Sequence, residues 1–284
     1  MKRQLHLLVI DPQNDFCDLP AGYLPQNSTI QPALPVPGAH ADMQRIANLI
    51  QQGRQGLSGI SITLDTHHIL DIAHPGFWQQ ADAGPVAPFT SISAAQVRAG
   101  QYLPRQSAHL ARTLAYLDAL EASERYTLMV WPVHCAIGSW GHNVHADVYA
   151  AAQAWQAHSG QDIHFVNKGD NPWTEHYSAL MAEVPDQHSP QTQLNQDLLG
   201  LLAAQDRIYV CGEAGSHCVK ATLEHIVQHI GQQHWHKLVI LSDCISPVAG
   251  FDVVWQDFLT QMRALNLQIA SSSEVLPELL ENIA

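Results

Sequence analysis

Short apolar runs that alternate with segments of helical periodicity constrain the fold of this chain more than any other feature of its sequence. Six runs lack the polar-apolar alternation of half-exposed strands, which indicates strands buried on both faces of a parallel sheet. They occupy residues 5–10, 59–64, 127–131, 163–167, 207–211 and 237–241, with 267–271 as a candidate seventh. This alternation predicts a three-layer α/β/α sandwich around a mostly parallel, doubly wound, six-stranded sheet.

Three of the segments between these runs carry apolar residues on one stripe at helical spacing. In residues 41–53 the stripe includes Met43 and Ile50, and the segment closes on a glycine, a common helix end. Residues 217–231 and 249–266 show the same pattern. Helices in these places would supply the crossover connections that parallel strands require.

Residues 75–126 interrupt the alternation. The Pro- and Gly-containing stretch 74–89 predicts a loop, and residues 107–125 predict one amphipathic helix. A chain of 284 residues lies within the range of three-layer α/β folds that form one domain. We therefore expect a single domain over residues 1–284, with residues 75–126 as an insertion or lid rather than a second domain.

The charge balance limits the partners of this chain. Its 26 acidic and 13 basic residues give a formal net charge of −13, which argues against nucleic acid and anionic membranes as partners. No apolar run approaches the roughly 20 residues of a membrane helix, and the N-terminal run ends at Asp11, too early for a signal peptide. The five cysteines are dispersed without a CxxC pair, which argues against a disulfide framework or a cysteine-rich zinc site. These features predict a cytoplasmic protein.

Polar residues follow four of the predicted strands, at the edge where parallel sheets bind ligands. Asp11, Asp65 and Lys168 come directly after their strands, and Cys218 begins the helix beyond residues 207–211. Each has an ordinary explanation by itself: free cysteines are mostly packing residues, an aspartate before proline suits a turn, and a single lysine is usually solvated. Together, a carboxylate, an ammonium and a thiol at one edge indicate a cysteine hydrolase.

The chemistry of Cys218 supports this interpretation. A thiol with a pKa of about 8.5 is mostly protonated at neutral pH, and a helix N-terminus with a nearby cation such as Lys168 stabilises the thiolate. Asp11 would accept the thiol proton and pass it to a leaving amine. Glycines before Cys218 would allow a tight turn, and the backbone N–H groups of Ala214 and Cys218 would then face a developing oxyanion.

A second group of residues predicts a metal site. Asp65, His67, His74 and His134 offer one carboxylate and three imidazoles, a set that suits one divalent ion, zinc before iron or manganese. The chain has 18 histidines, so such spacings are common and carry little weight by themselves.

Five segments, in order along nearly the whole chain, resemble the isochorismatase-like cysteine hydrolases and, among them, the nicotinamidases. They read VIDPQNDF, LDTHH with a following AH, WPVHC, VNKGDNPW and VCGEAGSHCV. The resemblance implies a catalytic triad of Asp11, Lys168 and Cys218, oxyanion donors at Ala214 and Cys218, a cis Glu213–Ala214 peptide bond, and metal ligands at Asp65, His67, His74 and His134. It also implies Phe16 and Trp131 as aromatic walls for a flat ring. Where the chain departs from the family pattern, Trp173, His176 and Tyr177 after Lys168 are further wall candidates.

The same resemblance implies that the chain hydrolyses nicotinamide to nicotinate and ammonia through a thioester on Cys218, in the salvage of NAD. Its partner would be a small-molecule amide, and a homo-oligomer is the tendency of the family. One alternative is an amide or ureido hydrolase of the same superfamily whose insertion admits a larger substrate. Another, from a different class, is a metal-binding or sensor protein that uses its histidines without catalysis.

Overall fold

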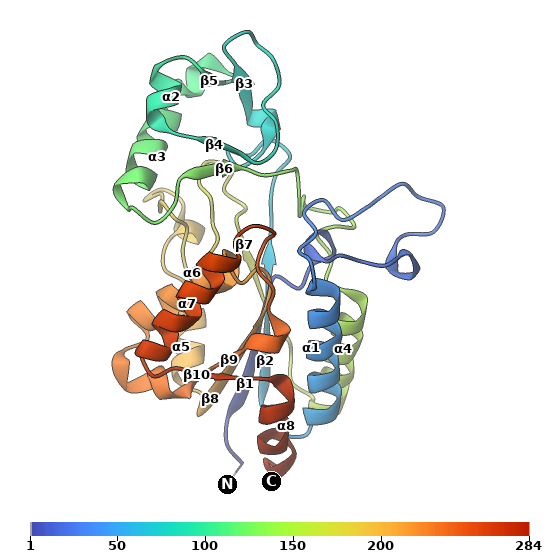
Figure 1. The fold of residues 1–284 in the computed structure, drawn as a ribbon. Helices are drawn as coiled ribbons and strands as arrows, with labels where there is room; N and C mark the ends of the chain where they lie inside the picture. The colour runs from blue at the N-terminus through green and yellow to red at the C-terminus, as the bar shows by residue number, and fades with distance from the viewer. Residues whose placement is uncertain (1, 284) are drawn as a thin grey trace.

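A parallel β-sheet of six strands forms the centre of the protein (Figure 1). The structure, a computed structural model, describes residues 2–283. In spatial order the strands are β10 (Gln268–Ala270), β9 (Leu238–Leu241), β8 (Arg207–Gly212), β1 (Leu5–Ile10), β2 (Gly59–Asp65) and β7 (His164–Lys168). Each neighbouring pair is parallel. The residues of β1 and β9 are buried throughout, as expected for strands covered on both faces.

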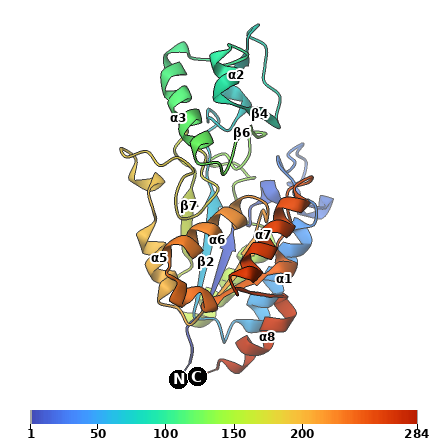
Figure 2. The ribbon, with the colours of Figure 1, turned by 60° about the vertical axis from the view of Figure 1, so that its left-hand side comes forward.

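Helices cover both faces of this sheet and complete the predicted three-layer α/β/α sandwich (Figures 1 and 2). One layer contains α1 (Ala39–Gly53), α4 (Ala146–Ser159) and α8 (Ser272–Glu281), and the other contains α5 (Gln196–Ala203), α6 (Cys218–His229) and α7 (Asp252–Ala264). The structure confirms the three predicted helices as α1, α6 and α7. Within residues 2–283, no helix combines the length and the apolar character of a membrane span.

The prediction that residues 127–131 form a strand of the central sheet was wrong. Strand β6 (Leu128–Val130) instead pairs antiparallel with β4 (Thr90–Ile92) in a separate two-stranded sheet. The sixth central strand is β10, which lies in the candidate seventh run. An apolar run reports burial and not the identity of the partner strand, and Leu128 and Val130 are buried in a different cluster.

Residues 75–126 form a compact substructure beyond the carboxyl ends of the sheet, at the top of Figure 1. It contains β3 (Trp78–Gln80) paired with β5 (Tyr102–Pro104), the short α2 (Ala94–Arg98), β4, and α3 (Leu110–Ala122). Its apolar side chains pack into a hydrophobic cluster of their own, around Trp78, Ile92 and Leu117. The stretch predicted as a loop therefore contains strand β3, and the predicted helix is α3.

Gly212, at the end of β8, has a backbone conformation that only glycine adopts at low cost. Its φ is +110°, and a Cβ atom there would lie 2.0 Å from the carbonyl oxygen of Ile10. We expect Gly212→Ala to lower the free energy of unfolding by about 2–4 kcal/mol, from backbone strain and overpacking together. Gly200→Ala is the control, because Gly200 lies within α5 with no atom near its Cβ position. That change should stabilise the protein by about 0.5–1 kcal/mol in urea unfolding. Equal stability of the two variants would contradict the assignment.

Candidate active site

Four neighbouring strands carry the predicted catalytic residues to one edge of the sheet. Asp11 directly follows β1, Asp65 ends β2, Lys168 ends β7, and Cys218 begins α6 after β8. Strands β8, β1, β2 and β7 are consecutive in the sheet, so their carboxyl ends bring these four side chains together.

Lys168 lies at the centre of this group and is 2% exposed. Its Nζ is 2.8 Å from Asp11 Oδ2, 2.9 Å from Asp65 Oδ1 and 3.6 Å from Cys218 Sγ. It also donates a hydrogen bond to the carbonyl oxygen of His176 at 3.1 Å. A buried ammonium requires such partners, because desolvation of an unpaired charge is costly.

Burial and charge act in opposite directions on these groups. Burial raises the pKa of Asp11, and Lys168 opposes that rise. Burial also raises the pKa of the Cys218 thiol well above its usual range, although the Lys168 charge favours the thiolate. Burial alone would lower the pKa of Lys168, but Asp11 and Asp65 outweigh it and raise that pKa. The thiol of Cys218 therefore carries its proton in the ligand-free site, and its ionisation must be coupled to the transfer of that proton.

The turn between β8 and α6 orients Cys218. The Glu213–Ala214 peptide bond is cis, as the sequence resemblance implies. The Ala214 carbonyl accepts hydrogen bonds from the N–H groups of His217 and Val219. Within residues 2–283 the N–H groups of Ala214 and Cys218 themselves donate to no protein acceptor. Both amides are therefore available to a ligand beside the thiol.

The Glu213 side chain belongs to the support of this turn rather than to the site. It is fully buried, and Ser246 N donates to its Oε2 at 3.3 Å. The Ser246 hydroxyl donates to Asp42 Oδ2 at 2.5 Å. Burial, with the nearby charge of Asp42, raises the pKa of Glu213 well above its usual range. A protonated Glu213 places no charge beneath the turn.

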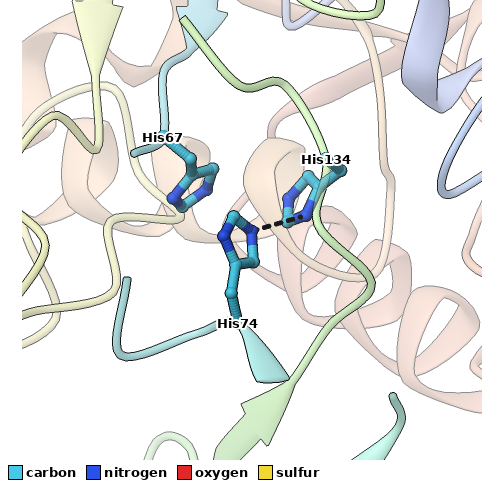
Figure 3. A group of neighbouring side chains, drawn as sticks. All are labelled: His67, His74 and His134. Atoms are coloured by element: carbon cyan, nitrogen blue, oxygen red, sulfur yellow. Dashed lines mark hydrogen bonds between the residues drawn. The ribbon is translucent and has the colours of Figure 1, made fainter. Parts of the chain in front are cut away.

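Three buried histidines converge next to the catalytic group, from two separate segments of the chain (Figure 3). One ring nitrogen from each of His67, His74 and His134 lies within 4.8 Å of the other two. Asp65 Oδ2 completes the group, at 3.2 Å from His67 Nε2 and 3.3 Å from His134 Nε2. Asp65 therefore touches both the histidines and, through its other oxygen, Lys168.

The Nδ1 atom of each ring is held by an oxygen acceptor. His67 Nδ1 is 3.1 Å from Asp71 Oδ2, His74 Nδ1 is 3.1 Å from the carbonyl of His68, and His134 Nδ1 is 2.8 Å from the carbonyl of Pro132. These contacts favour the tautomer with a proton on Nδ1 and leave the Nε2 lone pairs for a ligand, as in histidine-ligated metal sites.

Two of these rings have opposite protonation preferences in the metal-free site. Burial lowers the pKa of His74 to about 3, with a further contribution from His134, so its imidazole is neutral. For His67, burial is outweighed by the carboxylates of Asp65 and Asp71, which raise its pKa well above the usual value. A metal would replace the proton that His67 carries in the metal-free site. The donor set and its supporting hydrogen bonds fit a divalent ion such as zinc.

A narrow cavity opens onto Cys218 and onto the histidine group. Its walls combine aromatic rings, apolar side chains and a few polar groups, the usual composition of a small-molecule site. Trp131 Nε1 donates to the Tyr177 hydroxyl at 3.1 Å, which joins two of the aromatic walls. The residues that line it are Phe16, Leu34, Asp65, Trp131, His134, Glu175, Tyr177, Ala214, His217, Cys218 and Val248.

Comparison with known proteins identifies relatives over almost the full length of the chain. A nicotinamidase of Saccharomyces cerevisiae is 24% identical over 263 residues, which cover 93% of this chain and 97% of that protein. The solved structure of a yeast nicotinamidase superposes with a TM-score of 0.62 at 21% identity, over 94% of this chain and 99% of that one. An isochorismatase-like hydrolase of Alkaliphilus metalliredigens superposes with a TM-score of 0.51 at 13% identity, over 97% and 98% of the two chains. In fold the chain matches the isochorismatase-like hydrolases, and in sequence it is similar to a nicotinamidase.

Two further comparisons concern this chain. A pyrazinamidase of Pyrococcus horikoshii, solved in complex with zinc, superposes with a TM-score of 0.54 at 18% identity, over 94% of this chain and 99% of that one. No family model matches the chain. The predicted resemblance to the nicotinamidases is confirmed, and so is the expectation of a hydrolase, which disfavours a non-catalytic metal-binding protein.

The predicted site residues lie together in the structure, and others join them. Phe16 and Trp131 line the cavity, as does Tyr177, whereas His176 contributes its carbonyl to Lys168 and Trp173 lies outside. Sequence reasoning missed Glu175 and His217. The position of His217 directly before Cys218 was an available signal, but Glu175 lies in an irregular loop without a pattern to indicate it.

The first prediction for this site concerns the charge of Lys168. Lys168→Met leaves the carboxylates of Asp11 and Asp65 buried without their counter-charge, so we expect a loss of about 3–5 kcal/mol of unfolding free energy at pH 7. The folded-state pKa values of both carboxyls would then lie above the unfolded value of about 3.9. The loss should therefore shrink as the pH falls towards about 4, where the carboxyls become protonated.

Urea unfolding at several pH values measures this effect. The control is Lys237→Met, which removes a half-buried lysine whose Nζ donates to the carbonyl of Ala203. That variant should lose about 1 kcal/mol or less, without this pH dependence. Equal losses of unfolding free energy in the two variants would contradict the role of Lys168 as the counter-charge of Asp11 and Asp65.

The second prediction concerns the metal site and the support that Asp71 gives to His67. In Asp71→Asn an amide replaces the carboxylate beside His67 Nδ1, so the ring loses both its charge partner and part of its orientation. We expect zinc affinity to fall about 10- to 100-fold. Competition with a chromophoric chelator measures this affinity, and Asp82→Asn, in an exposed turn, should leave it unchanged. Unchanged affinity in Asp71→Asn would contradict the assignment of His67 as a ligand.

Proposed function

We propose that this isochorismatase-like hydrolase is a metal-dependent cysteine amidohydrolase that converts nicotinamide to nicotinate and ammonia through a thioester on Cys218. The observation that carries this proposal is the contact of Lys168 with Asp11 and Cys218 beneath a cavity with aromatic walls. The relatives with which the chain aligns over most of its length include nicotinamidases, which supports the choice of substrate.

In the proposed reaction, Asp11 removes the thiol proton while the Cys218 sulfur attacks the carboxamide carbon. The negative charge that develops on the amide oxygen is stabilised by the N–H groups of Ala214 and Cys218. Asp11 returns the proton to the nitrogen, and ammonia leaves as the thioester forms. A water molecule, deprotonated by Asp11, then hydrolyses the thioester to release the carboxylate and the thiol.

The raised pKa of Asp11 suits this exchange of protons. A carboxyl of ordinary acidity is a weak base at neutral pH, and burial makes Asp11 a stronger one. Lys168 limits that rise, so that Asp11 remains able to accept a proton from the thiol. Its charge also compensates the anion that forms on sulfur during the transfer.

The cavity walls suit a flat aromatic amide. Phe16 and Trp131 would stack on the ring, and Asp65, His67, His74 and His134 would hold a divalent metal beside it. When bound, that metal supplies a Lewis acid for the ring nitrogen of a pyridine. Pyridine carboxamides match both features, whereas an aliphatic amide would use neither.

Three further proposals come from the sequence: a single domain with residues 75–126 as an insertion or lid, a homo-oligomer, and a cytoplasmic enzyme of NAD salvage.

A second candidate function is the hydrolysis of a larger amide or ureido substrate. The observation in its favour is the position of the insertion, which ends just before strand β6 and Trp131 of the cavity wall.

Ammonia release from nicotinamide by the purified protein tests the proposal. We expect turnover that falls on chelation and returns with zinc, iron or manganese. Cys218→Ala should lower kcat by about 10⁴-fold or more while nicotinamide binding persists. Cys244→Ala, which removes another buried thiol, should retain activity. Turnover of a larger amide without turnover of nicotinamide would favour the second candidate, and comparable activity in Cys218→Ala would exclude the thioester.

A further inference from the structure

Phe89 of the insertion lies against the wall of the cavity. Strands β4 and β6 pair with Thr90 opposite Val130, so the next pair outward is Phe89 opposite Trp131. The N–H group of Phe89 donates to the carbonyl of Val130 at 2.6 Å. The two rings meet edge to face, with centroids 5.9 Å apart and planes at 83°. The pairing register therefore fixes this contact.

Phe89 is unusual in both conformation and exposure. Its φ is +62°, a left-handed conformation that is rare for a bulky residue and costs energy. Its side chain is 56% exposed and belongs to neither hydrophobic cluster in the described part of the chain. Core packing does not account for a strained and exposed aromatic residue, and backbone strain of this kind concentrates at functional sites.

Trp131 is held on several sides, and Phe89 provides one of them. The indole N–H is bound to the Tyr177 hydroxyl at 3.1 Å, and the ring meets His217 edge to face at 5.1 Å. The backbone N–H of Trp131 donates to Ala73 next to the histidine group, at 2.7 Å. Trp131 is only 3% exposed, and Phe89 of the insertion packs edge to face against its ring.

We propose that Phe89 is a positioning residue of the active site, through which the insertion holds Trp131 as a wall of the cavity and sets the affinity for an aromatic ring. This proposal rests on the proposed function, since the ring that Trp131 would stack on is that of the amide substrate. Phe89 acts on binding through Trp131 and has no part in the bond-making steps.

Steady-state kinetics with nicotinamide provides the first test. Phe89→Ala should raise KM about 3- to 10-fold, the size expected for one edge-to-face aromatic contact, and leave kcat within about two-fold. Phe89→Tyr should restore KM, because it keeps the ring. Phe165→Ala is the matched control: Phe165 is 44% exposed on edge strand β7, outside the cavity lining, and its loss should leave KM unchanged.

Phe89→Gly separates the ring from its backbone conformation. Glycine adopts a positive φ without penalty, so this variant should be at least as stable as Phe89→Ala and have the same raised KM. A wild-type KM in both variants, or a large loss of kcat with unchanged KM, would overturn the proposal.

A second measurement does not depend on the identity of the substrate. Alkylation of Cys218 by 2-iodo-N-phenylacetamide is compared with alkylation by iodoacetamide, each relative to a free thiol, by mass spectrometry. The phenyl ring should favour the first reagent in the wild type, and Phe89→Ala should reduce that preference about 3- to 10-fold, unlike Phe165→Ala. No turnover of nicotinamide together with this reduction would refute the proposed function and keep the role of Phe89. An unchanged preference would refute the role of Phe89.

Discussion

The ammonium group of Lys168 is buried between two carboxylates and a thiol, and the arrangement of the site depends on this cluster. A lysine in the protein interior is tolerated only with anionic partners, so Asp11 and Asp65 must both lie within contact distance of it. Their strands are neighbours in the sheet, and the register of β2 on β7 pairs Asp65 directly with Lys168. The contacts of Lys168 with the two carboxylates are therefore set by the pairing of strands in the central sheet. The same cluster links the Lys168 group to the histidine group, since Asp65 touches Lys168 with one oxygen and two histidines with the other.

The site also depends on burial, which raises the pKa values of Asp11 and Cys218. Cys218 and Asp11 both have raised pKa values because they are removed from water, so neither is an isolated anion before substrate binds. In the proposed mechanism Lys168 therefore stabilises the anion that forms transiently on the Cys218 sulfur, rather than a thiolate that is present before substrate binds. This differs from the simple expectation for a cysteine at a helix N-terminus, where the dipole and a cation stabilise the thiolate. The burial of the thiol and the two neighbouring carboxylates account for the difference.

The insertion extends the site from a separate hydrophobic cluster. Its strand β4 pairs with β6, which directly follows the insertion, and the chain continues from β6 through Trp131 to His134. One piece of irregular chain therefore contributes both an aromatic wall and a histidine, and its position is set by a packing unit outside the central sandwich. Such an arrangement lets the shape of the cavity vary without a change in the sheet that holds the catalytic cluster.

The amino-acid sequence was enough to predict the sandwich and the placement of Asp11, Asp65 and Lys168 at strand ends, because buried parallel strands are apolar throughout and polar residues that directly follow them lie at the ligand-binding edge. It also indicated the histidine group and the cis peptide bond, through resemblance to a known family. The tertiary structure was needed to show that β6 pairs with β4 outside the central sheet and that β10 is the sixth central strand. An apolar pattern indicates that a strand is buried but not which strand it pairs with. The contributions of Glu175 and Phe89 were likewise beyond the sequence, since they lie in loops whose place is set by contacts between residues far apart in the chain.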